Sequence, residues 1–171
     1  MKKDNIRDYA TEAFRLYAAL GRPSYDDIKE KIYQYALREE RKAEVKGGGI
    51  SKPTEQSLIN AQRAVDEFEA TLSDILAVEN TLKMLSLRDN GMDIKKAVEI
   101  VYFTEPKRPI RKNEISERVH MAEIAIPTTE PTVYRYLKIA RNVFGMERKL
   151  RNCKVDSSRF NIYDIMQVSE L

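Results

Sequence analysis

Apolar residues recur at helical spacing along most of the chain, and the interruptions in this pattern predict a series of helices. The first expected helix runs from about residue 4 to 20, with Gly21 where a C-terminal cap is wanted. A second expected helix continues from Ser24, which can cap a helix N-terminus, to about residue 45. The glycines at 47–49 then break the pattern. Because no Lys-Ser/Thr follows them at phosphate-loop spacing, we interpret them as a flexible turn.

The longest predicted helix extends from about residue 55 to 88, with Thr54 as its N-cap. Its apolar residues alternate at three and four positions over about four heptads, and they are Leu58, Ala61, Val65, Phe68, Leu72, Ile75 and Leu82. At 1.5 Å per residue the helix would span roughly 50 Å, which exceeds what a small domain covers by itself. The stripe therefore predicts either an antiparallel bundle with the first two helices or pairing with a second copy of the chain.

Two shorter helices and a polar connection dominate the segment from residue 112 to 144. Asp89-Asn90-Gly91 is a stop signal, and Asp93 is the expected cap of a helix that ends near Phe103. After a loop with Pro106 and Pro109, Asn113 is the expected cap of the first helix of the pair. We expect that helix to end near His120 or a few residues beyond. The predicted connection is 121–128, and Thr129 caps the second helix.

The second helix of this pair has one apolar and one cationic side. Val133, Leu137, Ala140 and Phe144 form the expected buried stripe, while Tyr134 and Tyr136 flank it, so that one is core and the other can reach a phosphate. Arginine can form two hydrogen bonds to guanine. Because Arg135 lies near the N-terminal end of this helix, which enters the major groove in such proteins, we expect this end to contact the bases. Lys138 and Arg141 lie further along, where phosphate contact is expected. The predicted DNA-contacting residues are Arg111, Lys112, Thr129, Thr132, Tyr134, Arg135, Lys138 and Arg141.

Three stretches of this region are similar to a known family. AVEIVYF, KNEISERVH and TTEPTVYRYLKIARNVF resemble region four of bacterial sigma factors and the related phage-encoded regulators of the ArpU type. The resemblance covers about fifty residues, 97–150. It implies a helix-turn-helix protein of phage or prophage origin that regulates transcription by binding promoter DNA through the helix after Thr129.

Charge and composition narrow the classes of function. The net charge is +3 over 171 residues, but residues 104–154 carry +6 and the remainder −3, so the predicted DNA-binding segment can supply phosphate contacts. A single cysteine, Cys153, excludes an intrachain disulfide and favours a reducing, cytoplasmic setting. No apolar run approaches the ~20 residues of a membrane span, and the N-terminus lacks a signal-peptide core. The lone His120 and the absence of a nucleophile or nucleotide-binding motif predict that the chain is not an enzyme and needs no cofactor or metal.

We therefore predict an all-α protein with an N-terminal helical bundle that contains a long helix. Residues 1–90 are expected to form this bundle, an oligomerisation or protein-contact module, 91–152 the helix-turn-helix DNA-binding domain, and 153–171 a C-terminal tail. The predicted partners are double-stranded DNA, RNA polymerase and a second copy of the chain, without a membrane. Two alternatives remain: a helical scaffold or phage assembly protein that binds protein partners, and a DNA-packaging recognition subunit.

Overall fold

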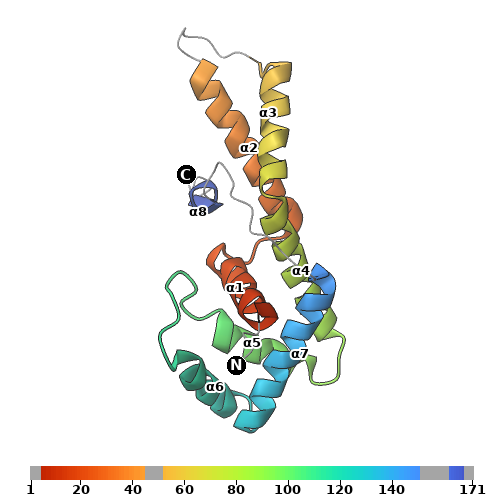
Figure 1. Cartoon of the computed structure of the whole chain (residues 1–171), viewed down its shortest axis with the longest axis vertical. Coiled ribbons are helices and arrows are strands. Elements are labelled where there is room, and N and C mark those ends of the chain that lie inside the picture. The colour runs from red at the N-terminus through yellow and green to blue at the C-terminus, as the bar shows by residue number, and fades with distance from the viewer. Residues whose placement is uncertain (1–4, 45–51, 151–161, 168–171) are drawn as a thin grey trace. The chain divides into compact units, whose positions relative to one another are not determined.

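A computed structural model describes residues 5–44, 52–150 and 162–167, and every regular element in those ranges is a helix. The predicted all-α class is therefore confirmed (Figure 1). The predicted turn at 47–49, Cys153 and most of the tail lie outside the described residues. The helices are α1 (Asn5–Ala19), α2 (Tyr25–Glu44), α3 (Glu55–Glu67), α4 (Glu69–Ser86), α5 (Gly91–Tyr102), α6 (Glu114–Ala125), α7 (Glu130–Arg148) and α8 (Ile162–Gln167).

The helices group into two compact units whose boundaries differ from the predicted domains. Unit 1 consists of residues 1–22 and 74–152, and unit 2 of residues 23–73 and 153–171. The predicted boundary at residue 90 separated α1 from the C-terminal helices, but α1 packs against α5 and α7. This contact joins residues distant in sequence, so the helical periodicity of the separate segments does not reveal it.

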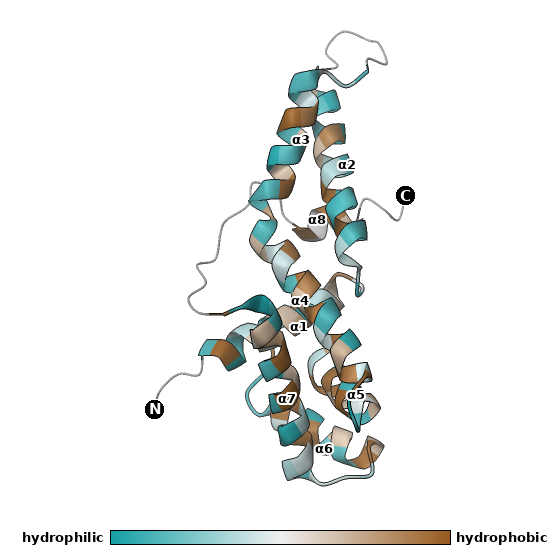
Figure 2. Ribbon diagram, turned by 90° about the vertical axis from the view of Figure 1, so that its right-hand side faces the viewer, coloured by the Kyte–Doolittle hydropathy of each residue, from teal (hydrophilic) through white to brown (hydrophobic). Residues whose placement is uncertain are grey.

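Unit 2 is built on α2 and α3, which lie side by side (Figure 1). Small residues allow the close approach, because Ala36, Ala61 and Ala64 are fully buried at the contact and Tyr33 packs over them. Both helices carry hydrophilic and hydrophobic turns in succession (Figure 2). The Thr54 hydroxyl accepts a hydrogen bond from the Ser57 amide at 3.1 Å, which confirms the predicted N-cap of α3.

The single helix predicted from residue 55 to 88 is divided at Phe68. There α3 ends and α4 begins, and the Phe68 amide donates to the carbonyl of Val65, three residues earlier, at 3.0 Å. This tight turn interrupts the regular ladder, but the predicted apolar stripe stays buried through it, at Ala61, Val65, Phe68 and Leu72. Leu58, a predicted member of the stripe, is 42% exposed, whereas Ser57 beside it is buried.

The core of unit 1 is aromatic and joins three helices. The Phe14 ring of α1 stacks on Tyr102 of α5, with centroids 5.6 Å apart and planes at 10°. The same ring meets Phe144 of α7 at a centroid distance of 5.6 Å. Phe14 and Phe144 are fully buried. Aromatic rings bury large apolar areas, so these contacts fix α5 and α7 against the N-terminal helix.

The turn before α5 requires glycine at one position. Asn90 has a φ of 58°, in the left-handed region, and precedes the first helical residue, Gly91, so the predicted cap at Asp93 is misplaced. A Cβ added to Gly91 would lie 1.7 Å from the carbonyl oxygen of Leu85. No other residue can allow this approach of two backbone segments.

Over the described ranges, no helix combines the length and the apolar character needed to cross a bilayer.

Candidate nucleic-acid interface

The connection between α6 and α7 is shorter than predicted. The helix α6 continues to Ala125, about one turn beyond His120, so the connection consists of 126–129 rather than 121–128. Ile126 anchors it, because this side chain is 2% exposed and its amide donates to the carbonyl of Ala122 at 2.8 Å. Helix-turn-helix units join their helices through turns of three or four residues. The four residues found here have that length.

The inward side of α7 agrees with the prediction. Val133, Leu137, Ala140 and Phe144 are at most 1% exposed. Tyr136 is the core tyrosine of the flanking pair, with 8% exposure, and Tyr134 is the accessible one, with 39%. The helix α7 packs against α1, α5 and α6 (Figure 1), and its outward side is left for other contacts.

The outward side of α7 presents two cations from successive turns. Arg135 and Lys138 are exposed, and neither forms a salt bridge with a described residue. At the start of the helix the hydroxyls of Thr129 and Thr132 lie 2.9 Å apart, at hydrogen-bond distance. Thr129 holds the predicted N-cap position, but its side chain makes no capping hydrogen bond. Hydroxyl and guanidinium groups near the N-terminus of a helix can donate hydrogen bonds to the base edges in a major groove.

Arg141 differs from these two cations. Its side chain is half-buried, and Nη1 donates to the hydroxyl of Tyr102 at 2.8 Å. The bond joins α7 to the last residue of α5 within unit 1. Among Arg135, Lys138 and Arg141, it is therefore Arg141 that has a side-chain hydrogen bond to another described residue.

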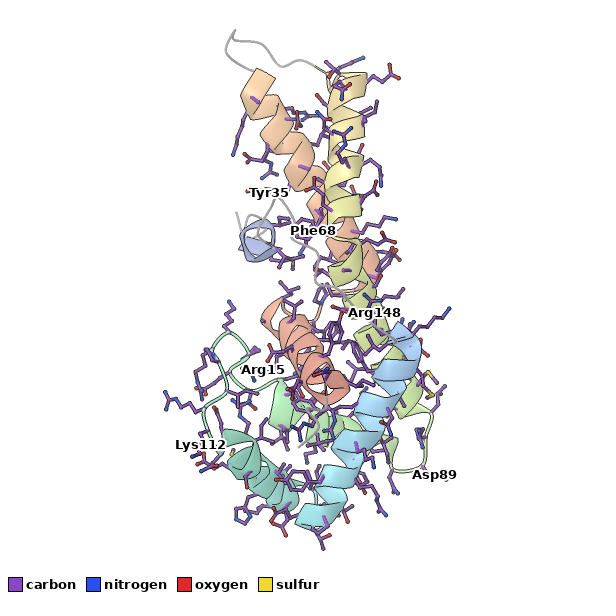
Figure 3. All side chains as sticks on the ribbon, in the orientation of Figure 1. Arg15, Tyr35, Phe68, Asp89, Lys112 and Arg148 are labelled. Atoms are coloured by element: carbon purple, nitrogen blue, oxygen red, sulfur yellow. The ribbon has the colours of Figure 1, made fainter. Side chains whose placement is uncertain are left out.

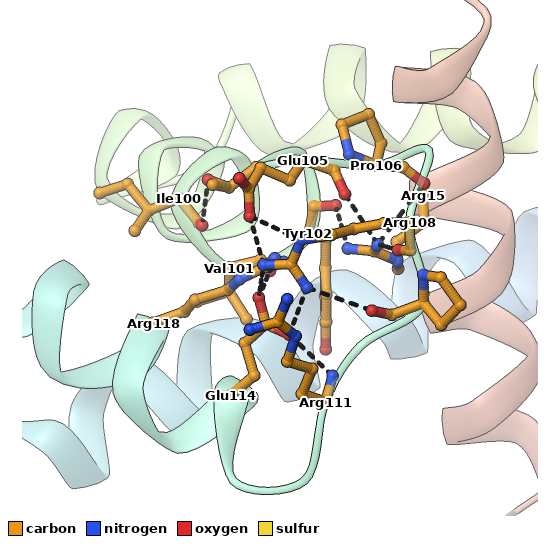
Figure 4. Close-up of polar contacts among 12 residues, drawn as sticks. Arg15, Ile100, Val101, Tyr102, Glu105, Pro106, Arg108, Arg111, Glu114 and Arg118 are labelled. Atoms are coloured by element: carbon orange, nitrogen blue, oxygen red, sulfur yellow. Dashed lines mark hydrogen bonds and ion pairs between the residues drawn. The ribbon is translucent and has the colours of Figure 1, made fainter.

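The loop between α5 and α6 brings further cations near the start of α6. Arg111 and Lys112 are exposed there, and Figure 3 shows Lys112 where the chain enters α6. The loop is held from inside by Arg15 of α1, a 4% exposed residue that the sequence reasoning missed. Its guanidinium donates to the carbonyls of Tyr102 at 3.4 Å, Glu105 at 3.1 Å and Pro106 at 3.4 Å (Figure 4). Burial is the main cause of a lowered pKa at Arg15.

Glu114, the first residue of α6, is the centre of an ionic cluster (Figure 4). Its carboxylate accepts hydrogen bonds from Arg108 at 3.0 Å, from the Arg111 amide at 2.7 Å and from Arg118 at 2.6 Å. Arg118 also donates to the carbonyl of Val101 at 2.9 Å. The hydrogen bond from Arg108, followed by that from the Arg111 amide, lowers the pKa of Glu114 from 4.5 to about 2.

This cluster replaces the capping predicted for Asn113. Asn113 has a φ of 67° and makes no side-chain capping bond. The carboxylate of Glu114 instead binds the backbone just ahead of the helix, at Arg111. The spacing of Glu114 and Arg118, four residues apart, is the signal in the sequence that indicates such a pair.

The described residues hold no group of three His, Cys, Asp or Glu side chains that could bind a metal ion. The lone histidine, His120, is exposed on α6, and its Nδ1 lies 3.1 Å from the Glu123 carboxylate. Unit 1 thus presents a pair of helices with a short connection and accessible cations on the outward side of α7.

No family model matches the chain, and no solved structure matches it. Among curated proteins, it is similar to the human tyrosine-protein kinase Fer, with 29% identity over 118 residues. The match covers 67% of this chain and 14% of the kinase.

Proposed function

We propose that this chain binds duplex DNA sequence-specifically through α7 and thereby regulates transcription. The observation that carries the proposal is the outward side of α7, where Arg135 and Lys138 are exposed and form no salt bridge with a described residue, while the opposite side is buried. The four-residue connection to α6 supports it, as does the resemblance to sigma region four and ArpU-type regulators. In this proposal the protein acts in the cytoplasm of a bacterium that carries a phage or prophage, and it has no catalytic role.

Each exposed group has a distinct task in this proposal. Arg135 and Thr132 are nearest the N-terminal end of α7 and read base edges in the major groove. Lys138 binds the phosphate backbone further along the helix, and Arg111 and Lys112 bind it from the loop before α6. Tyr134 donates its accessible hydroxyl to a phosphate. Arg141 supports α7 through Tyr102 and adds its charge to the local field.

Protein partners remain part of the proposal. RNA polymerase is the expected partner at a promoter, and unit 2 is the proposed site of pairing with a second copy. One observation favours the alternative of a scaffold that binds protein partners: Met121 and Ile124 on α6 are 58% and 73% exposed. Large exposed apolar side chains close to each other are typical of protein contacts.

A binding assay at two salt concentrations separates these alternatives. The full chain is mixed with a pool of random-sequence duplexes at about 50 mM and about 200 mM salt, and bound duplexes are recovered and sequenced. About four phosphate contacts predict an affinity about a hundredfold weaker at the higher concentration, together with an enriched sequence. A scaffold protein would enrich no sequence. The mass in solution separates a dimer from the ring that a DNA-packaging subunit would form.

The assignment of the recognition helix has its own control. Arg63→Ala removes one exposed arginine from α3 in unit 2 and matches the charge change of Arg135→Ala. We expect Arg135→Ala to weaken binding and Arg63→Ala to leave it unchanged. Lys149 is an exposed residue just after the C-terminal end of α7. If Arg135→Ala leaves binding unchanged while Lys149→Ala abolishes it, the assignment to the outward side of α7 is wrong.

A further inference from the structure

Unit 1 contains a cavity of about 460 Å³ that is lined by residues of α1, α5, α6 and α7 and of the loop between α5 and α6. This volume falls in the range of small-molecule sites, about 300–1,000 Å³. Its accessible apolar wall comes from Ile110 of the loop, Ile115 of α6 and Tyr134 of α7. Leu137 and Tyr102 also border the cavity, but they are 1% and 2% exposed. The cavity can therefore hold the apolar body of an organic molecule of moderate size.

The charged groups around the cavity differ in their ion pairing and in their exposure to water. Arg7 and Asp8 of α1 form a salt bridge with each other at 3.6 Å. Glu12 is exposed, so water screens its charge. Arg141 is half-buried and has no carboxylate within 4.0 Å among the described residues, and its recorded hydrogen bond goes to a neutral phenol, Tyr102.

A guanidinium carries five N–H donors, and the bond to Tyr102 uses one of them. Arg141 is one of the residues that line the cavity, and its other donors have no hydrogen bond to a described residue. Carboxylates accept two parallel hydrogen bonds from arginine, and such charge-assisted bonds are stronger in partly buried surroundings. An organic acid would thus supply both the missing negative charge and the apolar surface that this cavity can cover.

The geometry points to a binding site for a small organic acid, with its carboxylate on Arg141 and its aromatic or aliphatic body against Ile110, Ile115 and Tyr134. Such a ligand would contact α1, α6 and α7 together and stabilise their packing within unit 1. The inference does not depend on DNA binding. If both hold, the ligand and the DNA would act on the same helix, and occupancy of the cavity would alter the affinity for DNA.

The test compares acids with their uncharged counterparts on the full chain. A panel of aryl- and alkylcarboxylates of about eight to fourteen heavy atoms is titrated by calorimetry, each beside its primary amide. We expect at least one acid to bind with a dissociation constant below about 1 mM and about tenfold more tightly than its amide. Arg141→Gln should abolish this preference, while Lys138→Gln, an exposed residue of the same helix, should retain it.

A second variant distinguishes the cavity from a surface site. Thr11→Trp places a large ring into the cavity from α1 and should eliminate binding of both acid and amide, while circular dichroism checks that the helices remain. The inference is overturned if no acid binds saturably below about 10 mM. It is overturned equally if acids and amides bind alike, if Lys138→Gln weakens binding as much as Arg141→Gln, or if binding survives Thr11→Trp in a folded protein.

Discussion

Arg141 donates a hydrogen bond of 2.8 Å to the hydroxyl of Tyr102, and this bond joins α7 to the end of α5. The Tyr102 ring is 2% exposed and stacks on Phe14, so the hydroxyl is held in place by the aromatic core. A polar contact anchored in this way restricts how far α7 can turn about its own axis. The orientation of the outward side of α7 therefore depends in part on this pair.

The contribution of the pair is measurable by a double-mutant cycle. Tyr102→Phe and Arg141→Gln should each lower the free energy of unfolding, with a coupling energy of about 1 kcal/mol, because each change removes the same hydrogen bond. Chemical unfolding of both single variants and the double variant, followed by circular dichroism, gives the value. Additivity within about 0.3 kcal/mol would show that the bond contributes nothing to stability.

The ionic cluster at the start of α6 predicts a loss of stability in acid. The pKa of Glu114 is lowered from 4.5 to about 2, mainly by the hydrogen bond from Arg108, so folding favours its ionised form. This contribution is fully present above about pH 4.5 and is lost as the pH falls towards 2.

Glu114→Gln should therefore destabilise the protein at about pH 6 and do so less than half as much at about pH 3. Thermal unfolding at the two pH values checks this. Glu117→Gln changes an exposed acid of the same helix that lacks these arginine partners, and it should leave the pH dependence as in the parent. An equal effect of Glu114→Gln at both pH values would exclude the cluster as a source of acid sensitivity.

Replacing either of two glycines of unit 1 by alanine should change the free energy of unfolding, in opposite directions at the two positions. At Gly91 a Cβ would lie 1.7 Å from the Leu85 carbonyl oxygen, and relief requires movement of the backbone, at a cost of about 3 kcal/mol. At Gly145, inside α7, the nearest atom belongs to Ile6 and lies 3.8 Å away, which is an ordinary contact.

Gly145→Ala should accordingly raise the free energy of unfolding by about 0.5–1 kcal/mol, because alanine is the better helix former. The midpoint of thermal unfolding measures both variants. Similar midpoints for the two would contradict the close approach at Gly91.

Local signals in the sequence were sufficient for much of the fold. The glycine at 21 takes a φ of 82° after α1, as a C-terminal cap requires, and the Asp27 amide donates to the Ser24 hydroxyl at 3.2 Å. The apolar stripe of α7 is buried from Val133 to Phe144. These features depend on residues within a few positions of one another, which periodicity and capping preferences describe.

Contacts between segments distant in sequence could not be predicted from such local signals. Nothing in the spacing around Arg15 indicates that it binds carbonyls about 90 residues later, nor that α1 belongs with α5 and α7. The division at Phe68 also escapes a heptad count, since the seven-residue pattern passes through it. Of the candidate site, the exposed cations of α7 were predictable, whereas the contact of Arg141 with Tyr102 depends on the packing of two helices. Binding of DNA by these residues stays a prediction.

The central claim, that the outward side of α7 reads DNA, is tested most directly by the base preference of two arginine variants. Fluorescence anisotropy is measured with the duplex enriched by the parent protein and with every single-base variant of its site. We expect Arg135→Ala to weaken binding by about 1–3 kcal/mol and to lose discrimination at one or two adjacent base pairs, while Arg63→Ala behaves as the parent. Equal binding by Arg135→Ala and the parent, with every base preference intact, would contradict the account.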